Sequence, residues 1–490
     1  MADRDLDAAI AVTRFGLGAR PGELAEVRSD PRGWLKAQIR AQGADQPQTA
    51  GATAQQRIAE YRDFQQDRRE ARKELAAVKA GQDGGAGPPD KVPDSRDPVK
   101  MAQRMLREET GADFAARVQL ATNTDAGFRE RWALFWANHF TVSANKLVTA
   151  TVVGPFEQEA IRPHVFSPFV DLLGAVETHP AMLLYLDQAQ SIGPNSPAAQ
   201  YLKRGPARGV GQQAALTAGR QAGLNENLAR EILELHTVGI NGGYSQADVT
   251  EFARAMTGLS IGGLREAPEV SGAPIFRAVA HEPGDRNVMG VRYRAGGKEQ
   301  AGAILADLAA KPQTARFVCG KLARHFVADD PPPALVDRLT RSWMASGGDL
   351  ARVADTLIDS PEAWDPAPAK FKTPYEFLVS SWRAAGASPR GVGVLAPPLT
   401  AMGQKPFSAP SPKGWPEETE AWAAPDAIVK RMTWAQGFSA AAVGPRDPKV
   451  LASDALGARL RPATATMIAR AESRPEGFAL LLMSPEFQRR

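Results

Sequence analysis

Large apolar side chains occur on every side of one predicted helix, in the segment GFRERWALFWANHF. A helix that faces water carries a single apolar stripe, so this helix must be enclosed by other elements. Asn138 and His139 are its notable polar members, and His139 falls between Trp132 and Phe135 on the helical wheel. We therefore expect a chain that packs further helices around this one, with His139 as a hydrogen-bonded core residue.

The rest of the chain favours short helices, because 38 prolines and 44 glycines divide it into many segments. Thr373, Pro374 and Glu376 predict one helix start, as cap, first helical residue and capping-box acid. The only convincing strand pair joins 276–280 to 287–293. The predicted fold is mainly α, a multi-helix assembly with one short β-hairpin around residues 276–293.

Composition changes along the chain suggest four regions. Residues 1–54 form an N-terminal helical region, and 55–98 form a projecting charged helix followed by a Gly- and Pro-rich loop. Residues 99–260 form a central helical core that includes a basic loop at 188–225. Residues 261–490 contain the β-hairpin and a C-terminal helical region.

Charge and composition limit the classes of partner and compartment. The 59 Lys and Arg face 55 acids, so the net charge of +4 is small and spread out. A dedicated nucleic-acid binder would instead concentrate basic charge. No apolar run reaches about 18 residues, and the acidic N-terminus does not resemble a signal peptide. We expect a cytoplasmic protein without a membrane span, or an exported one if a leader was trimmed, with the lone Cys319 in the core.

The segment NENLAREILELHTVGINGGYSQADVTEFARAMTG predicts a helix, a Gly-rich turn and a second helix. Asn225 caps the first helix, Gly239 helps to end it, and Ser245 with Asp248 forms a capping box for the second. One face of the first helix is apolar and includes His236, which predicts a core histidine. Because His236 and Glu231 are five residues apart on a helix, an acid partner for His236 has to come from another segment.

The opposite face of the same helix carries Glu226, Asn227, Arg230, Glu231 and Glu234. One interpretation is a solvated face with ion pairs from Glu226 to Arg230 and from Arg230 to Glu234. The other is a polar network, buried around Arg230 and Glu231 and paired with other segments, and we predict this second arrangement.

The basic loop 188–225 is a candidate anion site. It contains no acid between Gln188 and the helix start at Asn225 but does contain Arg204 and Arg208. Loop cations and the positive end of a helix can together hold an anionic ligand. An ordinary loop is the alternative.

Seven motifs in the same order resemble the bacterial family called domain of unknown function 1800. They are RFGLGARPGE, WANHFTVS, HPAMLLYLD, the 225–258 segment, HEPGDRNVMG, KLARHFVADDPPP and the terminal SPEFQRR. The resemblance covers nearly the whole chain but implies no agreed activity, so it supplies no catalytic residues. Relatives often carry Asp after the His where this chain has His281 and Glu282, and many are thought to be exported.

Three functions follow from these residues. A binding or assembly module would use Asn227, Arg230 and Glu234, the charged helix at 55–80, or the loop around Trp415 and Trp422 to contact a protein partner. A metal-dependent hydrolase or oxidoreductase would hold a divalent metal through His and carboxylate ligands, for which His281, Glu282 and Asp285 at the predicted turn are candidates.

The third function is a metal-free acid–base enzyme that uses His236, Glu231 and His139 as catalytic residues. The spacing of the histidines does not choose between the two enzymes, since no His-x-x-x-His or Glu-x-x-His pair occurs. We place the binding or assembly module first and leave enzymatic activity open.

Overall fold

The computed structural model describes residues 2–49, 51–81, 98–204, 223–263, 270–367 and 369–490. Its described part is mainly helical, which confirms the predicted fold class. The N-terminal elements are α1 (Ala2–Ile10), η1 (Ala11–Phe15), α2 (Glu23–Val27), α3 (Pro31–Lys36), α4 (Ala54–Gly81) and α5 (Pro98–Asn123).

The central elements begin with α6. They are α6 (Gly127–His139), α7 (Leu147–Phe156), η3 (Glu157–Ile161), η4 (Arg162–His164), α8 (Phe169–Glu177), α9 (Pro180–Tyr185), η5 (Gln188–Gln190), α10 (Pro197–Arg204), α12 (Asn227–Glu231), η6 (Ile232–His236) and α13 (Gln246–Met256). Trp132 and Trp136 are fully buried, so the prediction of an enclosed helix is confirmed.

The C-terminal half continues with helices. They are α14 (Lys298–Ala310), α15 (Pro312–Phe326), α16 (Pro333–Ser346), α17 (Leu350–Asp359), η9 (Pro361–Trp364), α18 (Pro374–Ala384), η10 (Val392–Val394), α19 (Ala396–Ala401), α20 (Thr419–Trp422), α21 (Pro425–Ala442), α22 (Pro448–Leu456), η11 (Gly457–Arg459), α23 (Pro462–Ala469), α24 (Arg474–Met483) and α25 (Pro485–Gln488). Cys319 of α15 is buried, as predicted.

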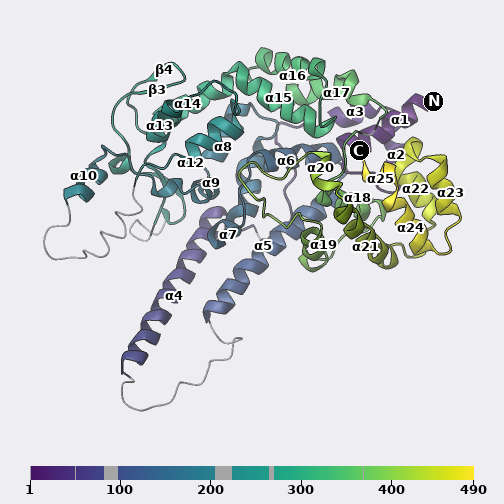
Figure 1. The fold of residues 1–490 in the computed structure, drawn as a ribbon, viewed down its shortest axis with the longest axis horizontal. Helices are drawn as coiled ribbons and strands as arrows, with labels where there is room; N and C mark the ends of the chain where they lie inside the picture. The colour runs from purple at the N-terminus through teal and green to yellow at the C-terminus, as the bar shows by residue number, and fades with distance from the viewer. Residues whose placement is uncertain (1, 50, 82–97, 205–222, 264–269, 368) are drawn as a thin grey trace.

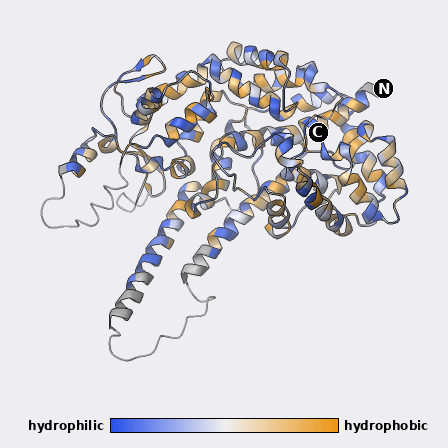
Figure 2. Cartoon of the chain, in the orientation of Figure 1, coloured by the Kyte–Doolittle hydropathy of each residue, from blue (hydrophilic) through white to orange (hydrophobic). Residues whose placement is uncertain are grey.

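The body of the molecule has α6 near its centre, with α14 to α17 above it and α21 to α24 to one side (Figure 1). The lower parts of α4 and α5 project together from the body. Hydrophilic residues dominate the projecting part of α4, whereas apolar residues gather near its base (Figure 2). Solvent around the projecting part explains its charged composition. The predicted loop that follows α4 lies mostly outside the described residues.

The strand pairing differs from the prediction. Residues 259–261 (β1, Leu259–Ile261) pair with β2 (Pro274–Phe276), and β3 (Arg286–Val288) pairs with β4 (Val291–Tyr293). The predicted pairing of 276–280 with 287–293 is therefore wrong. Met289 and Gly290 both have positive φ, which is the backbone of a two-residue turn that joins β3 directly to β4. The segment 278–280 (η8, Ala278–Ala280) is a short helical turn instead.

The apolar core has three parts. The largest surrounds α6, a second lies among α18, α21, α22 and α24, and a third lies among α5, α7, α18 and α19. In the described part of the chain, no helix has the length and apolar character needed to cross a bilayer.

Candidate functional site

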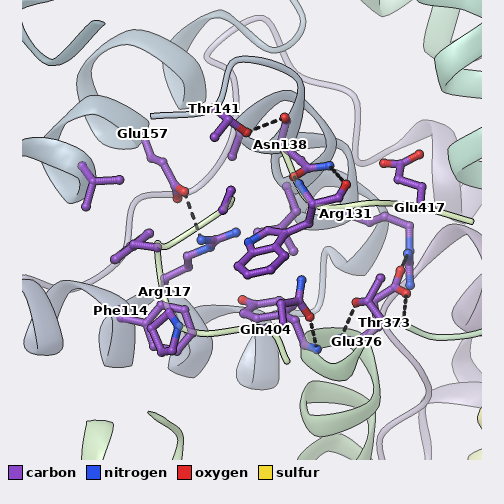
Figure 3. Close-up of a pocket in the computed structure, with 18 of the residues that line it drawn as sticks. Phe114, Arg117, Arg131, Asn138, Thr141, Glu157, Thr373, Glu376, Gln404 and Glu417 are labelled. Carbon is purple, nitrogen blue, oxygen red and sulfur yellow. Dashed lines mark hydrogen bonds and ion pairs between the residues drawn. The ribbon is translucent and has the colours of Figure 1, made fainter. Parts of the chain in front are cut away.

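A cavity of about 110 Å³ lies among α5, α6, α7, α18 and the loop 402–418 (Figure 3). This volume gives room for about four waters at their liquid density, or for a small organic molecule. Its apolar wall includes Leu17, Phe114, Leu134, Val153, Phe156, Phe407 and Trp415. Its polar wall includes Arg117, Arg131, Asn138, Thr141, Glu157, His325, Thr373, Tyr375, Glu376, Gln404, Lys405, Glu417 and Arg490.

Helix α6 divides its side chains between the cavity and the core. Arg131, Leu134 and Asn138 follow one another at spacings of three and four residues, so they lie on one helix face, and all three line the cavity. His139, the next residue along the chain, lies outside the cavity wall and is buried. The neighbouring polar residues Asn138 and His139 therefore lie in two different environments, the cavity wall and the core.

The loop 402–418 is held against α6 and the segment after it. Asn138 donates to the Trp415 carbonyl at 3.0 Å and accepts from the Trp415 amide at 2.8 Å. The Ala144 amide donates to the Phe407 carbonyl at 2.7 Å. Gly414 has φ +87°, and a Cβ there would lie 2.5 Å from the Asn138 carbonyl oxygen. Only glycine permits this approach, so the loop covers the cavity closely.

Arg117 of α5 is the cationic group with the most unused donors in the cavity. Its guanidinium lies 3.1 Å from Glu157, above the rings of Tyr375 and Phe407 at 5.1 and 5.4 Å. No hydrogen bond of suitable geometry joins it to another described residue. Burial raises the pKa of Glu157, although Arg117 and Arg162 oppose that shift. Arg117 is thus positioned by one carboxylate but keeps donors for a ligand.

Two buried arginines share one carboxylate beneath the cavity. Glu376 of α18 pairs with Arg131, and its carboxylate lies 2.8 Å from Arg490. Although burial opposes ionisation, Arg490 and Arg131 hold the pKa of Glu376 well below its usual range. Burial lowers the pKa of Arg131 to about 10. This cluster leaves one more positive than negative charge at the cavity floor.

His325 and Glu417 form a hydrogen-bonded pair in the wall. His325 Nδ1 donates to Glu417 Oε1 at 2.8 Å, while His325 Nε2 is buried and has no partner among the described residues. Burial lowers the pKa of His325, although Glu417 opposes the shift. Burial would raise the pKa of Glu417, but His325, Lys370 and Lys321 lower it overall. The pair is therefore a neutral imidazole beside a carboxylate.

Tyr375 carries a buried hydroxyl that has no hydrogen-bond partner among the described residues. Removing an unpaired polar atom costs no hydrogen bond, so we expect Tyr375→Phe to leave the free energy of unfolding unchanged, or to raise it by up to about 1 kcal/mol. Tyr293 is the matched control, because its hydroxyl donates to Asp307 at 2.8 Å. We expect Tyr293→Phe to lower that free energy by about 1 to 2 kcal/mol in urea denaturation. Equal losses in the two variants would contradict this prediction.

Two predicted catalytic residues, His139 and His236, lie together in the core rather than in the cavity. Their ring centroids are 6.1 Å apart, and His139 Nε2 donates to the His236 carbonyl at 3.2 Å. His236 Nδ1 donates to Glu177 Oε1 at 2.7 Å, which confirms that its acid partner comes from another segment. Burial, with smaller contributions from Lys321 and His236, lowers the pKa of His139 far below its usual value.

Glu231, the third predicted catalytic residue, is half-buried at the end of α12. Burial raises the pKa of Glu231. Its helix continues as the wider π-helical turn η6, which ends at His236. Glu177 rather than Glu231 occupies the position beside His236, so a catalytic pairing of Glu231 with His236 has no contact to support it.

The polar network around Arg230 lies at the surface, so the prediction that it is buried is wrong. Arg230 keeps 38% of its side chain exposed and lies 3.1 Å from Glu226. It also donates to Gln246 of α13 at 2.9 Å. Asn227 is exposed and Glu234 is half-buried. Arg230 connects α12 to α13 at the surface, because the apolar face of α12 occupies the core and turns the opposite face to water.

The three predicted metal ligands are engaged by other groups. His281 Nδ1 donates to the Thr257 carbonyl at 2.8 Å, and Glu282 accepts from the Asn195 amide at 2.7 Å. Asp285 lies 2.7 Å from Arg292. No three His, Cys, Asp or Glu side chains of the described ranges are arranged to hold a metal ion. A metal at these residues therefore stays a prediction.

The structure does not describe the side chains of the predicted anion site at Arg204 and Arg208. Arg204 ends α10, and its side chain and Arg208 lie outside the described residues. That site also stays a prediction.

Sequence reasoning did not identify Arg117, Gln404, Lys405 or Glu417 as site residues. The one available signal was the Pro- and Trp-rich loop, which was singled out for a partner contact and in fact covers the cavity. The other wall residues come from helices that are far apart along the chain. Their patterns match those of ordinary amphipathic helices, so nothing local distinguishes them.

The sequence matches a family model described as "Protein of unknown function (DUF1800)" over residues 10–489. No curated protein and no solved structure matches the chain.

Proposed function

The chain belongs to the DUF1800 family, whose description names no activity, and we propose that it binds a small organic carboxylate in the cavity between α5, α6 and α18. The observation that carries this proposal is the state of Arg117. It faces the cavity with an ion pair to Glu157 but with no hydrogen bond to a described residue. Guanidinium groups in this state are suited to bidentate recognition of a carboxylate.

Other groups on the wall agree with an anionic ligand. Gln404 accepts from the Tyr375 amide at 2.7 Å, and no described residue takes up its side-chain N–H groups. Lys405 is exposed beside it, with no carboxylate of a described residue within ion-pair distance. Four cationic side chains and three carboxylates line the cavity, and burial favours neutral His325. The cavity thus has unused donors and a positive balance of charge.

The apolar wall sets the second requirement on the ligand. Leu134, Phe407 and Trp415 line the cavity together with the polar groups. Ligand sites commonly combine an apolar lining with a few polar groups that orient the ligand. A carboxylate with a short aliphatic or aromatic tail satisfies both parts of the wall.

Binding is better supported than acid–base catalysis. The imidazole in the cavity wall is that of His325, and its unpartnered Nε2 atom is buried against the protein. A substrate proton cannot reach that atom while the ring keeps this position, and a general base needs hydrogen-bond reach. The buried pair His236 and Glu177 does not line the cavity.

We expect isothermal titration to detect binding of pentanoate, hexanoate or their amino derivatives, with inorganic phosphate as the comparison. Arg117→Lys should weaken that binding about tenfold or more, since a charge-assisted bidentate contact contributes roughly 1.5 to 3 kcal/mol. The substitution keeps a cation opposite Glu157, which limits its effect on stability. Lys405→Ala should weaken binding by a smaller factor.

Lys449 provides the matched control, because it is exposed and its helix α22 contributes nothing to the cavity wall. Lys449→Ala should leave the affinity unchanged. The proposal is wrong if the unsubstituted protein binds none of these carboxylates, or if Arg117→Lys and Lys449→Ala bind them equally well.

A further inference from the structure

We propose that the ligand of this cavity is a zwitterion, with its carboxylate at Arg117 and an ammonium group at Glu417. This inference rests on the proposed function and names the class of ligand: a small amino acid with an apolar part. The inference follows from the separation of Arg117 and Glu417 in the cavity wall and from the apolar residues that line the same cavity.

Glu417 presents an unused acceptor to the cavity. Its Oε1 accepts from His325 Nδ1 at 2.8 Å, and its Oε2 accepts no hydrogen bond from a described residue. The Glu417 side chain is 15% exposed and lines the cavity. Because Oε2 is not among the fully buried unpartnered atoms, some of its surface stays accessible.

The carboxylate is held in its ionised form. His325 donates a hydrogen bond to it, and the nearby cations Lys370 and Lys321 favour its charge. Lys370 itself donates to the Glu417 carbonyl at 2.6 Å, which fixes the backbone of the residue. An ionised oxygen with a free acceptor site is a natural partner for an ammonium N–H.

Arg117 and Glu417 lie on opposite sides of the cavity, and Asn138 and Gln404 lie between them in the view of Figure 3. A ligand that spans the cavity with a carboxylate alone would cover the Glu417 oxygen without giving it a donor. Leaving a desolvated carboxylate oxygen unpaired is costly. A ligand with an ammonium at its second end satisfies both charged groups, which gives electrostatic complementarity.

Matched ligand pairs test this inference on the full chain. The pairs are 6-aminohexanoate with hexanoate and 5-aminopentanoate with pentanoate. The amino acid in each pair carries its amine and carboxylate at opposite ends, and the members of a pair differ by the amine alone. Isothermal titration should show that at least one amine-bearing member binds tenfold or more tightly than its partner acid. Glu417→Gln should lower the affinity for that amino acid about tenfold and leave the affinity for the acid nearly unchanged.

Glu420 gives the control substitution, because it is an exposed acid of α20 that does not line the cavity. Glu420→Gln should bind both members of each pair as the unsubstituted protein does. If Glu417→Gln does not fold, the comparison of matched ligands on the unsubstituted protein decides the question alone.

The outcomes separate this inference from the proposed function. Binding of the acids as tightly as the amino acids overturns the zwitterion and leaves carboxylate binding in place. Equal weakening of both members by Glu417→Gln does the same. Absence of binding by any of the four compounds overturns the proposed function, and the zwitterion with it.

Discussion

Replacing Glu376 by alanine is expected to lower the free energy of unfolding by about 4 kcal/mol, the largest loss of any single substitution considered. Glu376 is 7% exposed, and it is the ion-pair partner of both Arg131 and Arg490, whose side chains are each 2% exposed. Its removal leaves two guanidinium groups buried with one carboxylate fewer. It also removes half of the capping box with Thr373 that begins α18. Urea denaturation monitored by circular dichroism measures the effect.

Asp248 supplies a matched control for this substitution. It occupies the same capping-box position at the start of α13, where Ser245 is the cap. Among the described residues it pairs with no buried arginine, and it also accepts from the Met289 amide at 2.6 Å. Asp248→Ala should therefore cost about 1 to 2 kcal/mol. A loss in Glu376→Ala no larger than the loss in Asp248→Ala would mean that the shared ion pair contributes little.

The contribution of two buried histidines to stability is expected to fall as the pH decreases below about 6.5, the usual pKa of histidine in an unfolded chain. Burial lowers the pKa of His139 and of His325 in the folded protein. The unfolded chain therefore binds more protons than the folded chain between the lowered pKa values and about pH 6.5. The stabilisation is complete above that pH and is lost as the pH falls, by about 1 kcal/mol per pH unit for each such histidine.

The variant His139→Gln isolates one of these groups. Its amide N–H can donate to the His236 carbonyl in place of the imidazole, but the side chain does not titrate. We expect urea denaturation between pH 7 and 5 to give a slope smaller by about 1 kcal/mol per pH unit than in the unsubstituted protein. Asp113, whose pKa burial raises to about 6, stabilises the fold as the pH falls, and it is present in both proteins.

The half-exposed His164 is the control for the pH experiment. His164→Gln makes the same substitution at a side chain that water reaches in the folded protein, so it reports what a His-to-Gln change does outside the core. An identical slope in His139→Gln and in the unsubstituted protein would contradict the expected role of His139.

Local patterns predicted the helices well, because the forces that form them act between near neighbours. The capping boxes of Ser245 with Asp248 and of Thr373 with Glu376 are both present. The apolar arc that runs through α12 and η6 correctly placed His236 in the core. The hairpin was placed less well, because Met289 takes a positive φ that favours glycine or asparagine and gives no turn signal in the sequence.

The sequence patterns predicted least well which charged residues are buried. Arg230, with polar neighbours on its helix face, was expected inside and keeps 38% of its side chain exposed. Arg129, Glu130 and Arg131 start an apolar helix and are all buried. Their partners are Asp45, Arg162 and Glu376, which are distant along the chain. A charged side chain is stable in the interior only where it forms an ion pair with an opposite charge. No local sequence pattern predicts such a pair when the partner is distant along the chain.

The sequence by itself determined that this protein is mainly helical, that α6 lies inside it, and where several of its helices begin, since propensity, capping and amphipathic spacing depend on residues within a few positions of each other. The tertiary structure alone decided which charged side chains form ion pairs and which residues line the cavity. Arg117, Lys405 and Glu417 reach one cavity only because α5, α6 and α18 pack around the loop 402–418. Their common environment is a property of that packing, which distant parts of the chain produce together.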